Sequence, residues 1–390
     1  LENKKLKMAL EKSINDITEE DLISLITNSV SESKKLDYKK ELLGNNREDK
    51  KEFLADVSSF ANALGGYIIF GIEEEGGIAK TINGLDALDC DAEKLRLENI
   101  IRDGIEPRIF GISINSLQLS NGNFLILVFI PNSWSKPHVV NFSNHWRFYS
   151  RNSAGKYQLD YLEVKSLFFV SETTTNKIRD FIQNRISNII AGETPLEKEL
   201  VKDSYVILHI IPINAYESKS KYDFNDLMND PSILKPLHYR SYNHRLNFDG
   251  ILTYTPSDLI SGEFSYLQLF RNGIIEAVNT SLLSTKQNDV FGIPAATLRN
   301  EINSTVERVI ELYKNFQIQP PFLVFLNLLG VKDYIIFATP YQMWDMRPLD
   351  RNNLFIPEAL LEDYESNIND KLKYIYDSIW NAAGLKEAYE

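Results

Sequence analysis

An unbroken apolar run at residues 67–72, Tyr-Ile-Ile-Phe-Gly-Ile, constrains the fold of this chain more than any other segment. It follows Gly65-Gly66 and ends at the three glutamates of residues 73–75. A run of strand length without polar alternation is typical of a strand that is buried on both faces. The sequence therefore predicts a buried central strand here, with a cluster of carboxylates at its end.

The segments around this strand alternate between helical and extended patterns. Apolar side chains at Phe53, Val57, Phe60 and Leu64 follow the helical period, and the two glycines after them predict the end of that helix. This mixture predicts the α+β fold class, with a mixed sheet and flanking helices over residues 1–170. The elements expected are a helical lead-in over 1–30, helices over 48–64, 91–106 and 159–169, and strands at 36–39, 110–119, 123–131 and 145–151.

A chain of 390 residues is too long for one ordinary hydrophobic core, so two domains are expected. The polar run Ser-Glu-Thr-Thr-Thr at 171–175 is the predicted boundary, and a helix over about 176–190 follows it. The second domain, 176–390, is predicted to be an α+β accessory domain that dimerises or binds a partner. The elements expected in it are strands at 205–212, 249–255, 267–278, 322–331 and 334–340, and helices near 294–315 and 357–382.

Composition limits the functions that the chain can have. The formal net charge is −12, so any binding of nucleic acid must depend on a local basic patch. The sequence has no apolar run of membrane-spanning length, and its single cysteine, Cys90, cannot form an intrachain disulfide; both favour a cytoplasmic protein without a membrane partner. The segment GGIAKT at 76–81 has alanine where an ATP-binding P-loop requires glycine, so no nucleotide cofactor is expected.

Two acids and a lysine near the start of the first domain form a candidate catalytic site. The alternating strand 36–39 would place Asp37 and Lys39 on one face, and Glu32 lies five residues before Asp37. Clustered carboxylates hold Mg²⁺ or Mn²⁺, which activates water for phosphodiester hydrolysis, and a nearby lysine offsets developing charge. A third acid would come from residues 73–75. In the alternative interpretation these groups are solvated charges at a strand edge, and the three glutamates are a polar turn.

A segment rich in arginine and aromatic residues precedes residue 160. Arginines interleaved with aromatic rings suit stacking on bases and pairing with phosphate. The predicted nucleic-acid contacts are Arg147, Tyr149, Arg151 and Lys156, with Arg151 preferred as the residue that grips phosphate. The alternative is a strand with Trp146 and Phe148 packed inward and Arg147, Tyr149 and Arg151 on the other face.

Three segments in order resemble the Schlafen AlbA-type domain over about residues 28–170. They are ESKKLDYKKEL from Glu32, FLADVSSFANALGGYIIFGIEEE from Phe53, and FYSRNSAGKYQL from Phe148. In Schlafens that cleave RNA, two acids of the first segment and one acid after the second form the site. The resemblance thus implies a metal-holding triad of Glu32, Asp37 and Glu74, with Lys39 as the accompanying lysine. Glu73 or Glu75 takes the third position if the strand ends differently.

The function that this resemblance implies is a metal-dependent endoribonuclease, a hydrolase acting on structured RNA, foremost tRNA, in bacterial stress or anti-phage defence. Animal Schlafens pair two such lobes into a horseshoe around RNA, and the single copy here predicts a homodimer. Bacterial proteins with this domain are often labelled only as DNA-binding or ATP-binding. Two alternatives therefore stay open: a non-catalytic regulator that binds RNA or DNA, and a subunit of a defence complex that recruits a separate effector.

Overall fold

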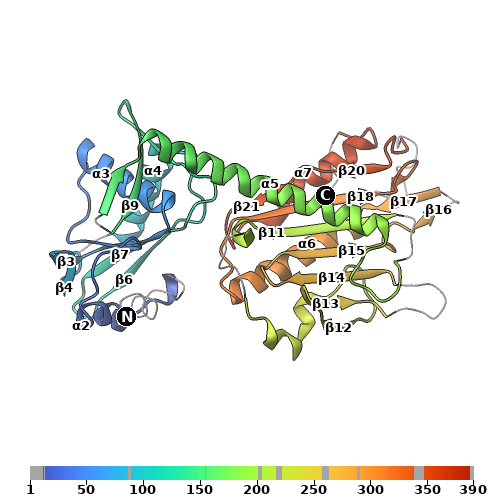
Figure 1. Ribbon diagram of the computed structural model, residues 1–390, viewed down its shortest axis with the longest axis horizontal. Helices are drawn as coiled ribbons and strands as arrows, with labels where there is room; N and C mark the ends of the chain where they lie inside the picture. The colour runs from blue at the N-terminus through green and yellow to red at the C-terminus, as the bar shows by residue number, and fades with distance from the viewer. Residues whose placement is uncertain are drawn as a thin grey trace. The chain divides into compact units, whose positions relative to one another are not determined.

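The computed structural model describes residues 12, 14–86, 89–153, 155–200, 204–216, 222–256, 263–287, 290–337 and 347–386 (Figure 1). By its internal contacts the chain divides into two compact units, Leu1–Thr174 and Thr175–Glu390. Each unit combines sheets with helices, which confirms the predicted α+β class. Of the predicted helical lead-in, residues 1–11 and 13 lie outside the described residues; the rest holds a 3-10 turn, η1 (Ile14–Asp16), and helix α2 (Glu19–Thr27).

The first unit is built on a four-stranded sheet in the order β1-β2-β7-β6. Strand β2 is the predicted central strand: all five of its residues are buried, and it pairs parallel with β1 and antiparallel with β7. The predicted pair of strands around Asn121-Gly122 is also confirmed as β6 and β7. The strands are β1 (Leu36–Lys39), β2 (Gly66–Phe70), β6 (Ser113–Gln118) and β7 (Phe124–Ile130).

Helices cover both faces of this sheet, which explains why its central strand is apolar throughout. Helix α2 packs on one face with Tyr38, Ile69 and Leu127. Helices α3 (Arg47–Asn62) and α4 (Cys90–Gly104) pack on the other face, with Ile68 and Val128 (Figure 1). The predicted helices 48–64 and 91–106 are therefore both present, with ends that differ by one or two residues.

The chain leaves α3 through the two glycines that the sequence singled out. Gly65 has a φ of 68° and its N–H donates to the Phe60 carbonyl, which closes the last turn of the helix. Gly66 lies so close to β1 that a Cβ added to it would come within 2.4 Å of the Lys35 carbonyl oxygen. These glycines let the central strand start directly beside the strand that carries Asp37.

A second four-stranded sheet, in the order β10-β9-β8-β5, lies against α3. Asn62, the last residue of α3, holds the two layers together, since its Nδ2 donates to the carbonyls of His138 and Tyr149. The strands are β5 (Ile105–Glu106), β8 (Val139–Phe142), β9 (His145–Asn152) and β10 (Gly155–Gln158). A separate hairpin, β3 (Ile72–Glu75) with β4 (Ile78–Ile82), continues from β2.

The prediction of two helices separated by a polar boundary is wrong. Helix α5 runs without a break from Tyr161 to Ala191, and the division between the two units falls inside it (Figure 1). The threonines that looked like a linker stay helical, and the hydroxyl groups of Thr173 and Thr174 donate to the carbonyls of Phe169 and Val170 four residues earlier. Side-chain bonding within the helix thus accommodates a composition that is typical of loops.

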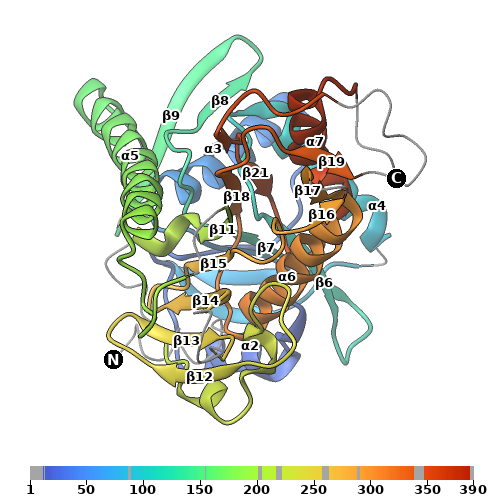
Figure 2. The ribbon, with the colours of Figure 1, turned by 90° about the vertical axis from the view of Figure 1, so that its right-hand side faces the viewer.

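The second unit centres on an antiparallel sheet in the order β12-β13-β14-β15-β11-β18-β20, with β21 also paired to β18. Helices α6 (Ala295–Asn315) and α7 (Ile368–Ala382) pack on one face, and Ile178, Ile182, Ile186 and Ile189 of α5 pack on the other (Figure 2). The strands are β11 (Tyr205–Pro212), β12 (Asn243–Leu246), β13 (Gly250–Tyr254), β14 (Ser265–Phe270), β15 (Ile275–Asn279), β18 (Phe322–Leu329), β20 (Asn353–Phe355) and β21 (Ala359–Leu361).

Smaller elements complete this unit and correct two predictions. The segment 267–278 is a hairpin of β14 and β15 rather than one strand, because Gly273, with a φ of 88°, reverses the chain. The predicted helix 357–382 begins only at Ile368, since 359–361 is strand β21. The remaining elements are β16 (Lys286–Gln287), β17 (Val290–Pro294), β19 (Ile335–Phe337), η2 (Ile213–Tyr216), η3 (Asn225–Met228) and η4 (Pro231–Leu234). No described helix is long and apolar enough to cross a membrane.

A buried ion pair fixes the C-terminal part of α5 to the large sheet. The Arg185 guanidinium donates to both Glu276 carboxylate oxygens, at 2.8 and 2.7 Å, and Tyr266 Oη donates to Glu276 Oε1 at 2.8 Å. His209 Nε2 lies 3.0 Å from Glu276 Oε2. Burial by itself raises the Glu276 pKa, but hydrogen bonds from Arg185 and His209 outweigh it and lower that pKa to about 2.

Arg185→Ala is expected to destabilise the second unit by about 3 kcal/mol, because it leaves the Glu276 charge buried without its partner. Chemical unfolding of the full chain, followed by circular dichroism, measures the loss. The matched control is Lys314→Ala, which breaks the exposed ion pair with Glu365 and is expected to change stability little. Equal effects of the two variants would contradict the role given to Arg185.

A buried histidine makes the first unit sensitive to acid. Burial lowers the pKa of His138 to about 4, while its Nδ1 lies 2.7 Å from the Pro107 carbonyl and its Nε2 2.5 Å from Ser133 Oγ. Between an unfolded pKa of about 6.5 and this folded value, only the unfolded chain takes up the proton. The neutral His138 ring therefore contributes its full stabilisation above pH 6.5, and this stabilisation is lost as the pH falls toward 4.

We expect the free energy of unfolding to fall by roughly 3 kcal/mol through His138 between pH 6.5 and 4. Urea unfolding at pH 7 and pH 4.5 measures it, with His138→Gln as the comparison. The variant has no group to titrate in this range, so its stability should depend less on pH than that of the wild type. Identical pH dependence in both proteins would show that His138 does not carry the effect.

Candidate active site

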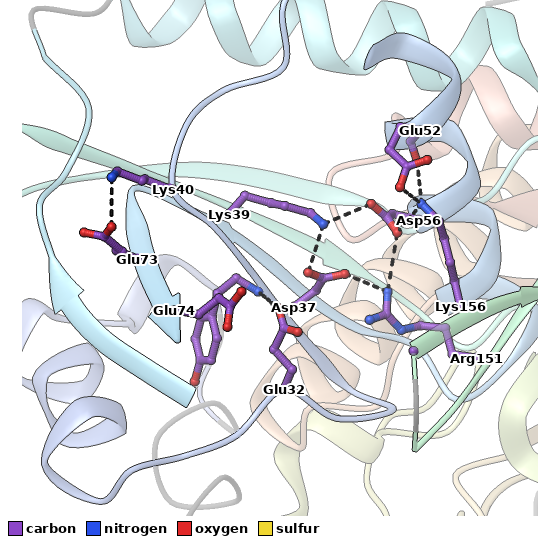
Figure 3. A pocket seen from close by; sticks show the side chains of 12 residues that line it. Glu32, Asp37, Lys39, Lys40, Glu52, Asp56, Glu73, Glu74, Arg151 and Lys156 are labelled. Atoms are coloured by element: carbon purple, nitrogen blue, oxygen red, sulfur yellow. Dashed lines mark hydrogen bonds and ion pairs between the residues drawn. The ribbon is translucent and has the colours of Figure 1, made fainter. Parts of the chain in front are cut away.

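Four segments of the first unit that are far apart in the sequence surround one pocket of about 530 Å³. Its carboxylates come from the segments before and within β1, from α3 and from β3: Glu32, Asp37, Glu52, Asp56, Glu73 and Glu74. Its basic side chains come from β1, the residue after it, β9 and β10: Lys39, Lys40, Arg151 and Lys156. Six acids thus face four bases, and all three acids of the predicted triad line the same pocket (Figure 3).

Glu32 and Asp37 form an adjacent pair at the start of the sheet. The Glu32 N–H donates to the Gly77 carbonyl at 2.6 Å, and its Oε1 accepts from the Tyr38 N–H at 2.9 Å. The bond from Tyr38 holds the Glu32 carboxylate beside Asp37, whose negative charge acts on it. Burial, opposed by the Tyr38 bond and reinforced by the Asp37 charge, raises the Glu32 pKa to about 7.

Asp37 is the hub of the pocket and is almost entirely buried. Its Oδ1 lies 3.2 Å from Lys39 Nζ, and its Oδ2 accepts from Arg151 Nη1 at 2.9 Å (Figure 3). Burial acts to raise the Asp37 pKa, but the charges of Lys39 and Arg151 outweigh burial and lower it. The strand alternation therefore places Asp37 and Lys39 on one face as predicted, and Asp37 is held ionised by two cations.

Asp56 of α3 is a pocket residue that the sequence interpretation missed. Its buried carboxylate lies 3.3 Å from Lys39 Nζ, 3.0 Å from Lys156 Nζ and 3.8 Å from Arg151 Nη1. The available signal was its position in the helix: Asp56 stands between Phe53 and Phe60 on the apolar face, where a charge needs partners. An acidic residue on the predicted apolar face of a helix indicates that this face packs against a polar site.

The glutamates after the central strand have three different environments. Glu74 lines the pocket and its Oε2 accepts a hydrogen bond from the Gly77 N–H, next to the Glu32 backbone. Glu73 also lines the pocket and pairs with Lys40 at 2.8 Å, whereas the Glu75 side chain is 82% exposed and pairs with Lys80. Strict alternation would turn Glu73 away from Glu74, but the register of β3 against β4 shifts between these two residues.

Arg151, the residue expected to grip phosphate, lines the pocket but is enclosed rather than exposed. Its side chain is 4% exposed, its guanidinium lies 4.0 Å from the centre of the Phe60 ring, and it is paired with Asp37. Because β10 pairs Lys156 directly opposite Arg151, Lys156 also reaches the pocket, where it contacts Asp56 and Glu52. Two of the four predicted nucleic-acid contacts, Arg151 and Lys156, therefore form ion pairs with carboxylates of the pocket.

The other two predicted contacts lie along the same strand but outside the pocket. Arg147 is exposed and donates to Gln158 at 2.7 Å, while Tyr149 is half-buried against the core. The alternative interpretation of this strand was wrong about Trp146, whose side chain is 64% exposed rather than packed inward. The cause is that α3 covers the face of β9 that carries Tyr149 and Arg151.

The oxygen ligands that the pocket offers suit a hard divalent cation, but they amount to two carboxylates rather than three. Among the residues that the structure describes, no three His, Cys, Asp or Glu side chains form a group arranged to hold a metal ion. The Glu32–Asp37 pair nevertheless offers adjacent oxygen ligands, and Mg²⁺ in phosphate enzymes is commonly held by one or two carboxylates plus substrate and water. Glu32 and Asp37 are therefore the residues that would hold it.

The pocket lies in a segment that matches a known protein family. Residues 32–160 match the family model described as Schlafen, AlbA_2, a range that begins at Glu32 and includes every residue of the pocket. The chain carries a Schlafen AlbA-type domain. Domains of this family are associated with nucleic acids and, in general, with nuclease-like activity.

The other comparisons add little to the Schlafen AlbA-type assignment. No curated protein matches the chain. Among solved structures, the crystal structure of the DIP2311 protein from Corynebacterium diphtheriae aligns at 21% identity with a TM-score of 0.26, over 36% of this chain and 27% of that one. The aligned part is about a quarter of that protein, and a TM-score of this size carries no argument.

Arg151→Ala is expected to destabilise the Schlafen AlbA-type domain by about 3 kcal/mol, because Asp37 loses a buried counter-ion and Phe60 loses the stacked guanidinium. Arg151→Lys should recover little of this, since a lysine cannot both stack and donate in the same plane. The control is Arg147→Ala on the same strand, whose exposed side chain should matter little. Thermal and urea unfolding compare the three variants, and wild-type stability in Arg151→Ala would refute the burial argument.

Proposed function

We propose that this protein is a divalent-metal-dependent endoribonuclease that cleaves structured RNA, with tRNA as the first substrate class to test. One observation carries the proposal: two neighbouring carboxylates, Glu32 and Asp37, lie beside Lys39 in an open pocket of a Schlafen AlbA-type domain. Carboxylates that hold a cation next to a lysine are the groups that phosphodiester hydrolysis needs.

The charge of the pocket supports a requirement for metal. With six carboxylates against four basic groups, the bare pocket repels a phosphodiester. A bound divalent cation would cancel this negative excess, polarise the phosphate and supply a metal-activated water. Glu74 lines the same pocket from the side of Gly77, but the described residues hold no group of three acids arranged around one ion, so the ion is assigned to Glu32 and Asp37.

The basic side chains differ in what they can reach. Lys39 is about a third exposed and Lys156 about a fifth, so both can meet a phosphate oxygen from the pocket, whereas Arg151 is enclosed and acts through Asp37. We therefore assign the offsetting of developing charge to Lys39 and phosphate binding to Lys156. Arg151 holds Asp37 in its ionised form and in a fixed position.

A non-catalytic regulator that binds nucleic acid is the second candidate, and one observation favours it. Both oxygens of Asp37 already contact a cationic side chain, Lys39 or Arg151, so a metal ion must compete with them. A regulator would bind RNA or DNA equally well with and without divalent metal, and the charge of Asp37 would not matter to it.

Purified protein is expected to cleave bulk tRNA with Mn²⁺ or Mg²⁺ and to stop when EDTA is added. Asp37→Asn and Glu32→Gln, which preserve shape, should each lower the rate on the order of 100-fold or more, because the carboxylate pair is broken. Glu75→Gln is the matched control, since the exposed Glu75 is outside the pocket, and its rate should equal that of the wild type.

The nuclease proposal fails if tRNA, other RNAs and DNA all stay intact with wild-type protein under both metals. Retained binding of one of these nucleic acids in EDTA would then favour the regulator. Cleavage that survives in Asp37→Asn would place the chemistry elsewhere or in a contaminant.

A further inference from the structure

We infer that Asp56 is a positioning residue of this site, which fixes the basic side chains that meet the phosphate. The inference rests on the proposed function, because it assigns part of the machinery of the same pocket. It concerns a residue on α3 that contributes neither to the entry segment nor to the glutamates after the central strand.

The geometry sets Asp56 apart from the carboxylate pair. Its Oδ2 lies 3.3 Å from Lys39 Nζ, and its Oδ1 lies 3.0 Å from Lys156 Nζ and 3.8 Å from Arg151 Nη1. These three cations come from three different strands, β1, β10 and β9, and converge on one carboxylate (Figure 3). Glu32, by contrast, accepts from the Tyr38 N–H and has no basic partner among the described ion pairs.

The position of Asp56 allows it to restrict the motion of flexible lysine side chains. It lies in the interior of a sixteen-residue helix, its side chain is 5% exposed, and its backbone is fixed within α3. Lysine side chains lose much conformational freedom when they are ordered, so a rigid carboxylate that orders Lys39 and Lys156 in advance removes that cost from substrate binding. Asp37 alone cannot do this, because it does not contact Lys156 among the described ion pairs.

The Asp56 carboxylate also occupies a position in which a phosphate group could bind. A carboxylate with three cationic contacts presents the same partners that a phosphate oxygen would seek. Removing its charge should therefore make the pocket bind a simple anion more tightly, while the lysines lose the orientation that turnover needs. Opposite changes in anion affinity and in turnover are a signature that loss of folded protein cannot produce, because unfolding lowers both.

The test compares wild type, Asp56→Asn and the control Glu48→Gln, which removes an exposed charge from the same helix outside the pocket. Isothermal titration with inorganic phosphate measures anion affinity, and tRNA cleavage with Mn²⁺ gives kcat and KM. For Asp56→Asn we expect phosphate to bind on the order of tenfold more tightly and kcat to fall about 100-fold. Glu48→Gln should match the wild type in both measurements.

Phosphate affinity and kcat that both remain at wild-type values in Asp56→Asn would overturn the inference. If the wild type cleaves no nucleic acid, the proposed function fails, but the phosphate titration still decides whether Asp56 restrains the basic groups. If Asp56→Asn does not fold, Asp56→Glu replaces it: that variant keeps the charge but displaces it, so kcat should fall while phosphate affinity stays unchanged. Wild-type kcat in a folded Asp56→Glu would likewise refute positioning.

Discussion

The ion pair between Asp37 and Arg151 is the contact on which the rest of the first unit depends. It joins β1 of one sheet to β9 of the other across a distance of 114 residues in the sequence, and it is buried beside Phe60 of α3. A buried charge without a partner is costly, so the two sheets and the helix between them must keep this arrangement. The same requirement places Lys39, Asp56 and Lys156 around one opening.

The sequence predicted the parts of this site that lie on strands, because strand geometry is local. Asp37 and Lys39 share a face through alternation. Glu32 and Glu74 were grouped by the family resemblance, and each of them bonds the backbone of Gly77. It did not predict Asp56, since nothing local tells which buried helical position faces a cluster of cations. It also did not predict that Arg151 is buried, because arginine near aromatic residues is equally typical of a nucleic-acid surface and of a buried pair stacked on a ring.

The fold, too, was predictable where the signal in the sequence is local. The central strand and the hairpin at Asn121-Gly122 were predictable from a continuous apolar run and a turn signal. The unbroken helix α5 was not, because its threonines satisfy their hydroxyl groups within the helix and its isoleucines from Ile178 onward pack on the large sheet. The reversal between β14 and β15 was overlooked, although Asn272-Gly273 is the same turn signal as Asn121-Gly122.

The arrangement of charges in the pocket has a consequence for how such a site can work. Except for Glu74, which accepts from the Gly77 N–H, each carboxylate of the pocket already contacts a basic side chain or lies beside a neighbouring acid, and each basic side chain already contacts a carboxylate. A metal ion at the Glu32–Asp37 pair would weaken the hold of Asp37 on Lys39, and a phosphate would weaken the hold of Asp56 on Lys156. In a site that works as proposed, cation and phosphate would therefore favour each other's binding, because each would release partners that the other can use.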